Sequence, residues 1–254
     1  MQPPRMLDLS HLVELDQEDP EIGVGVVAPF DFVLDHEYWR WAPAGVSVYI
    51  TRTPYMEQQV GIEMARHLGQ DELLAAATQE LRVANPMVTV FACTSGSFVE
   101  GLAGEARCRG VMEKAGARRA LTTSGALLDA LRALGVARLA VATPYDAATS
   151  EHLLDFLVEA GVAVPSCAFG GLKRNIFRLA PASVRQLVMA ADDDQADAVF
   201  VSCTNVRTFD LLADLERELH KPVLSANQVT MWACLRAAGV RPSVPGQRLF
   251  ACQG

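Results

Sequence analysis

Two cysteines follow short apolar runs at matching places in the sequence, and their thiols are the strongest candidates for chemistry. Cys93 opens the stretch Cys93-Thr94-Ser95-Gly96-Ser97, and Cys203 opens Cys203-Thr204-Asn205-Val206-Arg207. The preceding residues, 87–92 and 198–202, are rich in Val and Phe, as in strands buried in a parallel sheet. Because open α/β sheets bind ligands at the carboxyl ends of their strands, both thiols are expected to face one pocket.

The residues around the thiols could stabilise negative charge. A cysteine between a strand and the N-terminus of a helix lies where the helix dipole favours the thiolate, so a lowered thiol pKa is expected. No histidine stands beside either cysteine, which leaves a protease-like Cys-His pair without support. Paired thiols across a substrate carbon suit proton transfer or addition to a double bond. Groups that could bind a carboxylate, or the enediolate formed from it, are Thr94, Ser95, Gly96, Ser97, Thr204 and Asn205.

Composition limits the function classes. The chain has 254 residues, half of them hydrophobic, a formal net charge of −8 and a pI of about 5.1. The charge argues against nucleic acid and anionic membranes as partners but allows a small anionic substrate. Without an apolar run of ~18 residues or a signal pattern, a cytoplasmic protein is expected. The six cysteines are spread singly, so no zinc or other metal site is predicted.

Apolar runs alternate with helical patterns along the chain, which predicts doubly wound parallel sheets of the α/β class. Helical spacing is found between the runs, for example at residues 54–68 and 71–83. Strands are expected at residues 22–28, 46–51, 87–92, 118–122, 138–142, 162–168, 198–202 and 222–225.

An internal repeat organises these elements. Pro144 lies 115 residues after Pro29 in a similar strand-end sequence, and Cys203 lies 110 residues after Cys93. Two features recurring at nearly one spacing predict two similar α/β lobes related by pseudo-twofold symmetry, with the active site in the cleft between them. The first lobe is expected to comprise residues 22–116 and 222–254 and the second lobe residues 117–221, after an irregular N-terminal lead-in at residues 1–21.

Four motifs carry a family resemblance. They are CTSGS at residues 93–97, CTNxRT at 203–208, TPY at 143–145 and SANQ at 225–228. Together they resemble the maleate cis-trans isomerase group of the aspartate/glutamate racemase superfamily, to which arylmalonate decarboxylase is related. The resemblance covers roughly residues 22–240 and implies a cofactor-independent enzyme, often a homodimer, that acts on a small carboxylate.

The resemblance also implies roles for individual residues. In these isomerases the first-lobe cysteine adds as a thiolate to the alkene, the resulting single bond rotates, and elimination releases the trans acid. By motif position Cys93 would be this nucleophile, and Cys203 would act as acid or base or hold the substrate. Tyr145 of the TPY motif and Asn175 of the loop after the predicted strand at 162–168 would bind carboxylates.

One turn departs from the family pattern. These isomerases usually end the first strand in Pro-Ser-Ser-Asn, whose asparagine touches a substrate carboxylate, whereas this chain has Pro29-Phe30-Asp31-Phe32. Because an aspartate repels a dicarboxylate, a monocarboxylate or a more apolar substrate than maleate is favoured.

Three alternatives to the isomerase remain open at this stage. A racemase of the superfamily usually has histidine where Asn205 follows the second Cys-Thr. An arylmalonate-type decarboxylase carries one of the two cysteines, in the second lobe, so that Cys93 argues against it. The third alternative is a carboxylate-binding protein without turnover.

Overall fold

Parallel strands form two four-stranded sheets in the computed structural model, which describes residues 6–14, 21–241 and 244–252. The first sheet has the order β2-β1-β3-β4, and the second has the equivalent order β6-β5-β7-β8. We call each sheet with its helices a lobe. The strands are β1 Ile22–Ala28, β2 Val46–Arg52, β3 Val88–Phe91 and β4 Ala120–Thr122, then β5 Leu139–Thr143, β6 Cys167–Phe169, β7 Ala198–Val201 and β8 Val223–Ser225. The predicted α/β class and two-lobed repeat are confirmed.

The central strands are apolar along their whole length because helices cover both faces of each sheet. Every residue of β3, β5 and β7 is buried. One apolar core runs through both lobes, from Val24 and Val90 in the first to Val141 and Phe200 in the second. Cys203 lies in this shared core, whereas Cys93 lies in a second apolar cluster within the first lobe, together with Val27 and Phe91.

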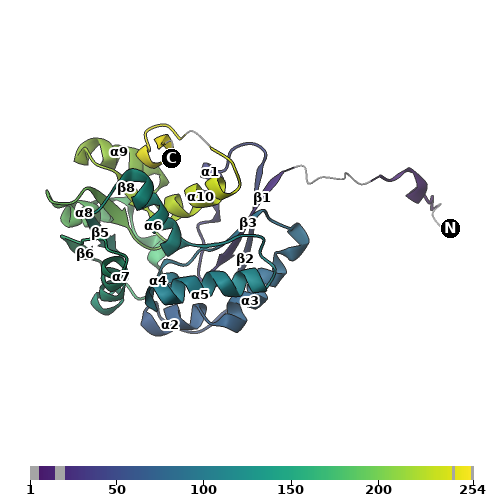
Figure 1. Ribbon diagram of the computed structural model, residues 1–254, viewed down its shortest axis with the longest axis horizontal. Coiled ribbons are helices and arrows are strands. Elements are labelled where there is room, and N and C mark those ends of the chain that lie inside the picture. The colour runs from purple at the N-terminus through teal and green to yellow at the C-terminus, as the bar shows by residue number, and fades with distance from the viewer. Residues whose placement is uncertain (1–5, 15–20, 242–243, 253–254) are drawn as a thin grey trace, which may run out of the picture.

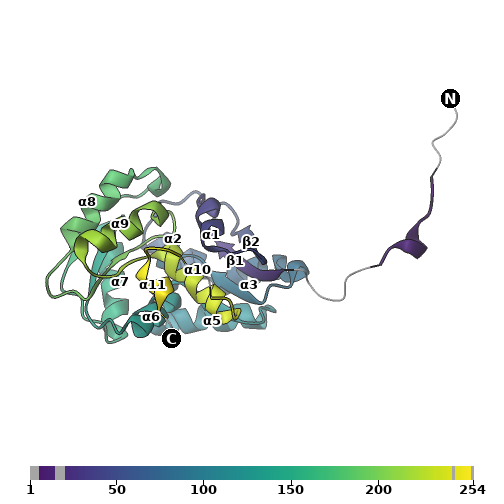
Figure 2. The ribbon, with the colours of Figure 1, turned by 90° about the horizontal axis from the view of Figure 1, so that it is seen from above.

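The helices of each lobe gather on opposite sides of the molecule, and α6 and α10 pack against each other between them (Figures 1 and 2). The first-lobe helices are α1 Asp35–Trp41, α2 Ile62–Leu68, α3 Asp71–Glu80, α4 Thr94–Phe98, α5 Gly101–Lys114 and α6 Thr123–Leu134. The second-lobe helices are α7 Ala147–Glu159, α8 Pro181–Ala191, α9 Phe209–Leu219, α10 Ala226–Ala237 and α11 Arg248–Ala251, and short 3₁₀ turns lie at Ser10–Leu12, Arg82–Ala84 and Ile176–Arg178.

Two edge strands lie in the sheet opposite to the one expected. β4, expected in the second lobe, pairs with β3, and β8, expected in the first lobe, pairs with β7. The connections from α5 to β4 and from α9 to β8 are only a few residues long, which returns the chain to the sheet it has just left. The helix that follows β8, α10, nevertheless packs against α1 and β3 of the first lobe as well as against β8.

The helix expected at residues 54–68 begins only at Ile62. Residues 53–61 instead run toward the second lobe, where the Val60 N–H donates to the Lys173 carbonyl at 2.9 Å. Pro54 disfavours the helical conformation in the residue before it, and the cross-lobe contact holds the segment extended.

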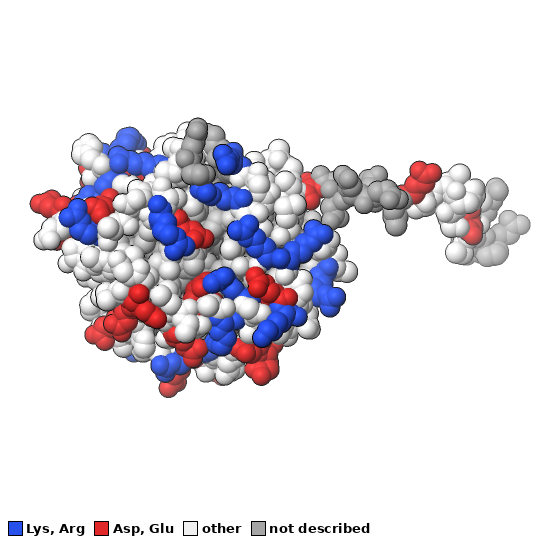
Figure 3. All heavy atoms as spheres, in the orientation of Figure 1, with Lys and Arg blue, Asp and Glu red and all other residues white. Residues whose placement is uncertain are grey.

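Part of the predicted lead-in falls outside the described residues, namely 1–5 and 15–20, as do residues 242–243 and 253–254 of the first-lobe prediction. Residues 6–14 are exposed and contain the turn Ser10–Leu12. Within the described ranges, no helix combines the length and apolarity needed to cross a bilayer. Charges of both signs are interspersed on the face shown in Figure 3.

Candidate active site

Cys93 lies between β3 and α4, as the apolar run before it predicted. It is the N-cap of α4, and its sulfur accepts a hydrogen bond from the Gly96 backbone N–H at 3.3 Å. A Cβ at Gly96 would lie 2.8 Å from the Phe91 ring and 3.1 Å from the Cys93 sulfur. Glycine is therefore required for the backbone to approach the thiol this closely.

Cys203 follows β7 in a backbone conformation unusual for a residue with a side chain. Its φ is +81°, in the left-handed region that favours glycine. The Asn205 N–H donates to its sulfur at 3.4 Å. Strained backbone of this kind is concentrated at functional sites, where the surrounding structure imposes it.

The two thiols meet where the lobes touch. The Thr204 hydroxyl, next to Cys203, donates to the carbonyl of Ala92, next to Cys93, at 3.2 Å. The two sulfurs are close enough to influence each other electrostatically, and both cysteines are buried, with exposed fractions of 3% and 8%. The structure thus brings together the two residues predicted to share a pocket.

The expected lowering of the thiol pKa is wrong. Burial raises the pKa of Cys93 and of Cys203 to about 12. Hydrogen bonds act in the opposite direction: Gly96 and Ser95 lower the pKa of Cys93, and Tyr145 and Asn205 lower the pKa of Cys203. The free-energy cost of removing a thiolate from water is larger than the stabilisation that those hydrogen bonds provide. The dipole of α4 adds little, because this helix has only five residues.

Three of the predicted binding residues present polar groups near the thiols. Tyr145 is buried and its hydroxyl hydrogen bonds to Cys203, while burial raises the pKa of Tyr145 and keeps the phenol protonated. The Ser95 hydroxyl lies 3.8 Å from the Cys93 sulfur. The Thr94 hydroxyl is buried without a hydrogen-bond partner among the described residues, so it can still donate to a ligand.

Asn205 is already engaged in holding the first-lobe turn. Its amide oxygen accepts from the Val33 N–H at 3.2 Å, and its amide nitrogen donates to the Asp31 carbonyl at 2.9 Å. Together with the Thr204 bond to Ala92, these contacts join the lobes beside the thiols. Both side chains thus have protein partners in the substrate-free structure.

Asn175 is not brought to the thiols by any contact within the described ranges. It is exposed, adopts a left-handed conformation with a φ of +53°, and precedes the turn Ile176–Arg178. Its carbonyl accepts from the Arg178 N–H at 2.9 Å. A role in binding substrate therefore stays a prediction for this residue.

Two acidic residues of the first lobe, Asp31 and Glu37, lie at contacts with the second lobe. Asp31 acts electrostatically on both thiols, and burial raises the pKa of its own carboxyl. Glu37 is buried in α1 and accepts hydrogen bonds from Thr208, Phe209 and Asn227 of the second lobe. Sequence reasoning missed Glu37, because its partners lie more than 170 residues away in the chain.

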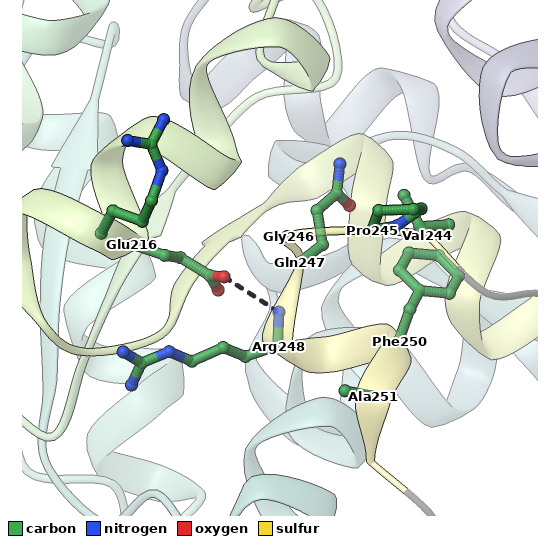
Figure 4. Close-up of a pocket in the computed structure, with 9 residues that line it drawn as sticks. Glu216, Val244, Pro245, Gly246, Gln247, Arg248, Phe250 and Ala251 are labelled. Atoms are coloured by element: carbon green, nitrogen blue, oxygen red, sulfur yellow. Dashed lines mark hydrogen bonds between the residues drawn. The ribbon is translucent and has the colours of Figure 1, made fainter.

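Two cavities lie elsewhere on the molecule, and neither Cys93 nor Cys203 lines them. One of about 370 Å³ is formed by α9 and the C-terminal segment, where Glu216 accepts from the Arg248 N–H at 2.9 Å (Figure 4). Another of about 420 Å³ lies between residues 57–64 and the pair Asp146 and Lys173, next to Tyr145. No cluster of three or more His, Cys, Asp or Glu able to hold a metal occurs in the described part of the chain.

The two-lobed α/β fold is the fold of enzymes of the isomerase and decarboxylase group. The chain belongs to the arylmalonate decarboxylase family, whose model matches residues 43–250. It is 29% identical over 193 residues to arylmalonate decarboxylase of Bordetella bronchiseptica, covering 73% of this chain and 80% of that protein.

Maleate isomerases are also similar to the chain. That of Pseudomonas putida is 30% identical over 129 residues, covering 50% of this chain and 52% of that protein. The structure of a Nocardia farcinica maleate cis-trans isomerase mutant with a covalently bound succinylcysteine intermediate shares the fold, with a TM-score of 0.84 at 23% identity over 92% of this chain and 99% of that one. The predicted resemblance to the isomerase and decarboxylase group is confirmed.

Proposed function

We propose that the protein is a cofactor-independent cis-trans isomerase of maleate or a related cis-enoic acid. The observation that carries the proposal is the pair of buried thiols, Cys93 from the first lobe and Cys203 from the second, at equivalent strand ends. Covalent addition to an alkene needs one nucleophilic thiol, and a second thiol opposite it can move the proton. The succinylcysteine intermediate of the Nocardia isomerase supports the same chemistry.

The proposed reaction needs no outside reagent. The Cys93 thiol gives its proton to the substrate carboxylate as its sulfur bonds to one alkene carbon, and the π electron pair moves to the other carbon as the protonated enediolate of its carboxylate. The remaining carbon–carbon single bond rotates. The electron pair then re-forms the double bond and expels the Cys93 sulfur, which takes its proton back, while Cys203 can lend a proton to the intermediate and recover it before elimination.

The surrounding groups suit the charge that develops. The Gly96 N–H is directed at the Cys93 sulfur, and Tyr145 at the Cys203 sulfur. The unpaired Thr94 hydroxyl and the Ser95 hydroxyl are donors for the enediolate. Burial keeps water away from these groups and strengthens their hydrogen bonds.

The test is proton NMR of the pure protein with maleate in deuterated buffer. Fumarate is expected without added cofactor. Cys93→Ser and Cys203→Ser should each reduce turnover at least ~10³-fold with the fold retained, whereas Cys252→Ser, a half-buried cysteine in the C-terminal segment, should leave it unchanged. A near-normal rate in either of the first two variants would contradict the two-thiol mechanism.

Decarboxylation of a substituted malonate is the second candidate, favoured by the family match over residues 43–250. It requires one proton donor at the carbon that loses carbon dioxide, which Cys203 could supply. The same NMR assay with an arylmalonate distinguishes it, since deuterium would enter the α-carbon of a monoacid product. That outcome, with maleate unchanged, would replace the isomerase proposal.

A further inference from the structure

The hydroxyl of Ser97 fastens the turn that carries Cys93. It donates to the Cys93 carbonyl at 2.7 Å and accepts from the Ser124 N–H at 3.2 Å, and the Ser124 hydroxyl lies 2.6 Å from it. Because a hydroxyl has one proton and two lone pairs, these contacts use its whole hydrogen-bonding capacity. In the substrate-free structure, Ser97 therefore serves the protein backbone and has no hydroxyl contact left for a substrate carboxylate.

The first turn of α6 is itself held in place, so Ser124 is a fixed anchor. The hydroxyl of Thr122, the N-cap of α6, donates to the buried Glu105 of α5 at 2.8 Å. The Thr123 hydroxyl lies 2.9 Å from that of Thr230 in α10. By contrast, α4 has only five residues, and a helix that short gains little stability from its own backbone hydrogen bonds. The position of α4 thus depends on α6.

The second lobe repeats this fastening at the equivalent place. Thr208 is the N-cap of α9 and follows Cys203 closely in the chain, and its hydroxyl donates to that of Ser225 at 2.9 Å. Ser225 is the N-cap of α10, as Thr122 is of α6. In each lobe, a hydroxyl just after the thiol is therefore hydrogen-bonded to the start of a helix, α6 in the first lobe and α10 in the second. These two helices pack against each other.

We infer that the packed pair of α6 and α10 is a platform that fixes the two thiols relative to each other, with Ser97 and Ser124 as positioning residues. Both serines act through backbone carbonyls, Ser97 through that of Cys93 and Ser124 through that of Thr94, at 3.2 Å. The inference rests on the proposed function, because thiol addition depends on where the sulfur lies. Displacement of a reacting group by about 1 Å can cost ~100-fold in rate.

The first arm of the test is the kinetics of Ser97→Ala and Ser124→Ala with maleate. In each variant kcat should fall roughly 10–100-fold and KM change less than ~3-fold, because the thiol and the enediolate donors act after the substrate has bound. The double variant should lose less than ~3-fold more than the slower single variant, because the two hydroxyls act as one unit. Thr78→Ala is the matched control. Its buried hydroxyl in α3 donates to the Leu74 carbonyl at 2.7 Å, and its removal should leave kcat unchanged.

The second arm needs no turnover and measures iodoacetamide modification of each thiol at one fixed pH by mass spectrometry. Ser97→Ala should raise the rate at Cys93 at least ~5-fold, because a released turn exposes the buried thiol, and should leave the rate at Cys203 unchanged. Thr208→Val removes the equivalent hydroxyl of the second lobe and should have the converse effect, with a faster rate at Cys203 alone.

The two arms separate the possible failures. Equal Cys93 modification rates in wild type and Ser97→Ala, or near-normal kcat in both serine variants, would overturn the inference and leave the proposed function standing. Modification rates that shift as expected in a protein that does not isomerise maleate would overturn the proposed function and support the platform. If the serine variants did not fold, Thr208→Val would decide, since an unchanged rate at Cys203 would overturn the inference.

Discussion

Both candidate catalytic thiols are protonated at neutral pH in the substrate-free protein, since the pKa of each is about 12. The thiolate is the nucleophile, so reactivity below the pKa follows a small thiolate fraction that increases about tenfold for each unit of pH. The proposed nucleophile, Cys93, is thus held in its less reactive, protonated form at neutral pH.

Alkylation by iodoacetamide measures this directly. The rate at which Cys93 is modified should rise continuously from pH 7 to pH 10, because the pKa lies above the whole range. A free cysteine derivative, with a pKa of about 8.5, should reach its plateau within that range and serves as the control. Mass spectrometry of the modified peptide gives the rate, and a plateau at Cys93 near pH 8 would contradict the raised pKa.

At the residue scale, the sequence reveals where the thiols are but not their state. Apolar runs before Cys93 and Cys203 were sufficient to place both at strand ends. Their pKa could not be inferred, because it depends on burial and on Asp31, which the fold brings from another strand end. The partners of Asn205 were equally hidden, since they lie more than 170 residues away.

Among the elements, α1 makes a buried polar contact that helps to hold the second lobe to the first. The Glu37 carboxylate accepts from the Thr208 N–H at 2.6 Å and the Phe209 N–H at 3.0 Å, so it caps the N-terminus of α9 across the lobe boundary. Its other oxygen accepts from the Asn227 amide at 2.7 Å. Negative charge at a helix N-terminus is favourable, and here it also satisfies buried donors.

Glu37→Ala should therefore destabilise the protein by about 3 kcal/mol, because buried N–H groups at the start of α9 lose their acceptor. For a chain of this size, the melting temperature should fall by roughly 6–12 °C. The Arg40–Asp210 pair also joins α1 to α9 but is exposed, so Asp210→Ala should cost at most about 1 kcal/mol. Equal losses in the two variants, measured by thermal unfolding, would contradict a special role for Glu37.

Most elements were predictable because their signals are local. Strands with continuous apolar runs, such as β1 and β3, follow from the sequence alone. The late start of the helix at Ile62 could not be predicted from the sequence, because a contact with Lys173 holds residues 53–61. The sheet to which β4 and β8 belong was also hidden, since pairing depends on neighbouring strands and not on the strand's own composition.

For the whole molecule, the repeat correctly predicted two lobes, and the structure adds that one apolar cluster spans both of them, beside a smaller cluster confined to the first lobe. Buried apolar side chains form a continuous cluster through both sheets. Between the lobes, α6 packs against α10, and the hydroxyls of Thr123 and Thr230 lie 2.9 Å apart. A site assembled from one thiol of each lobe needs such a core, because its geometry survives only if the lobes keep their relative position.

A shared core has a thermodynamic consequence, which is that the lobes should unfold together. Calorimetry should show a single transition with equal calorimetric and van't Hoff enthalpies. Leu153 of α7 is fully buried, so Leu153→Ala should destabilise the protein by about 3 kcal/mol. The midpoint temperature of the single transition should then fall by roughly 6–12 °C without the transition splitting. Val83 is exposed, so Val83→Ala should leave the midpoint temperature unchanged. If Leu153→Ala instead produced two transitions, the second lobe would be unfolding alone, and the pairing of Cys93 with Cys203 would depend on the docking of two independent domains.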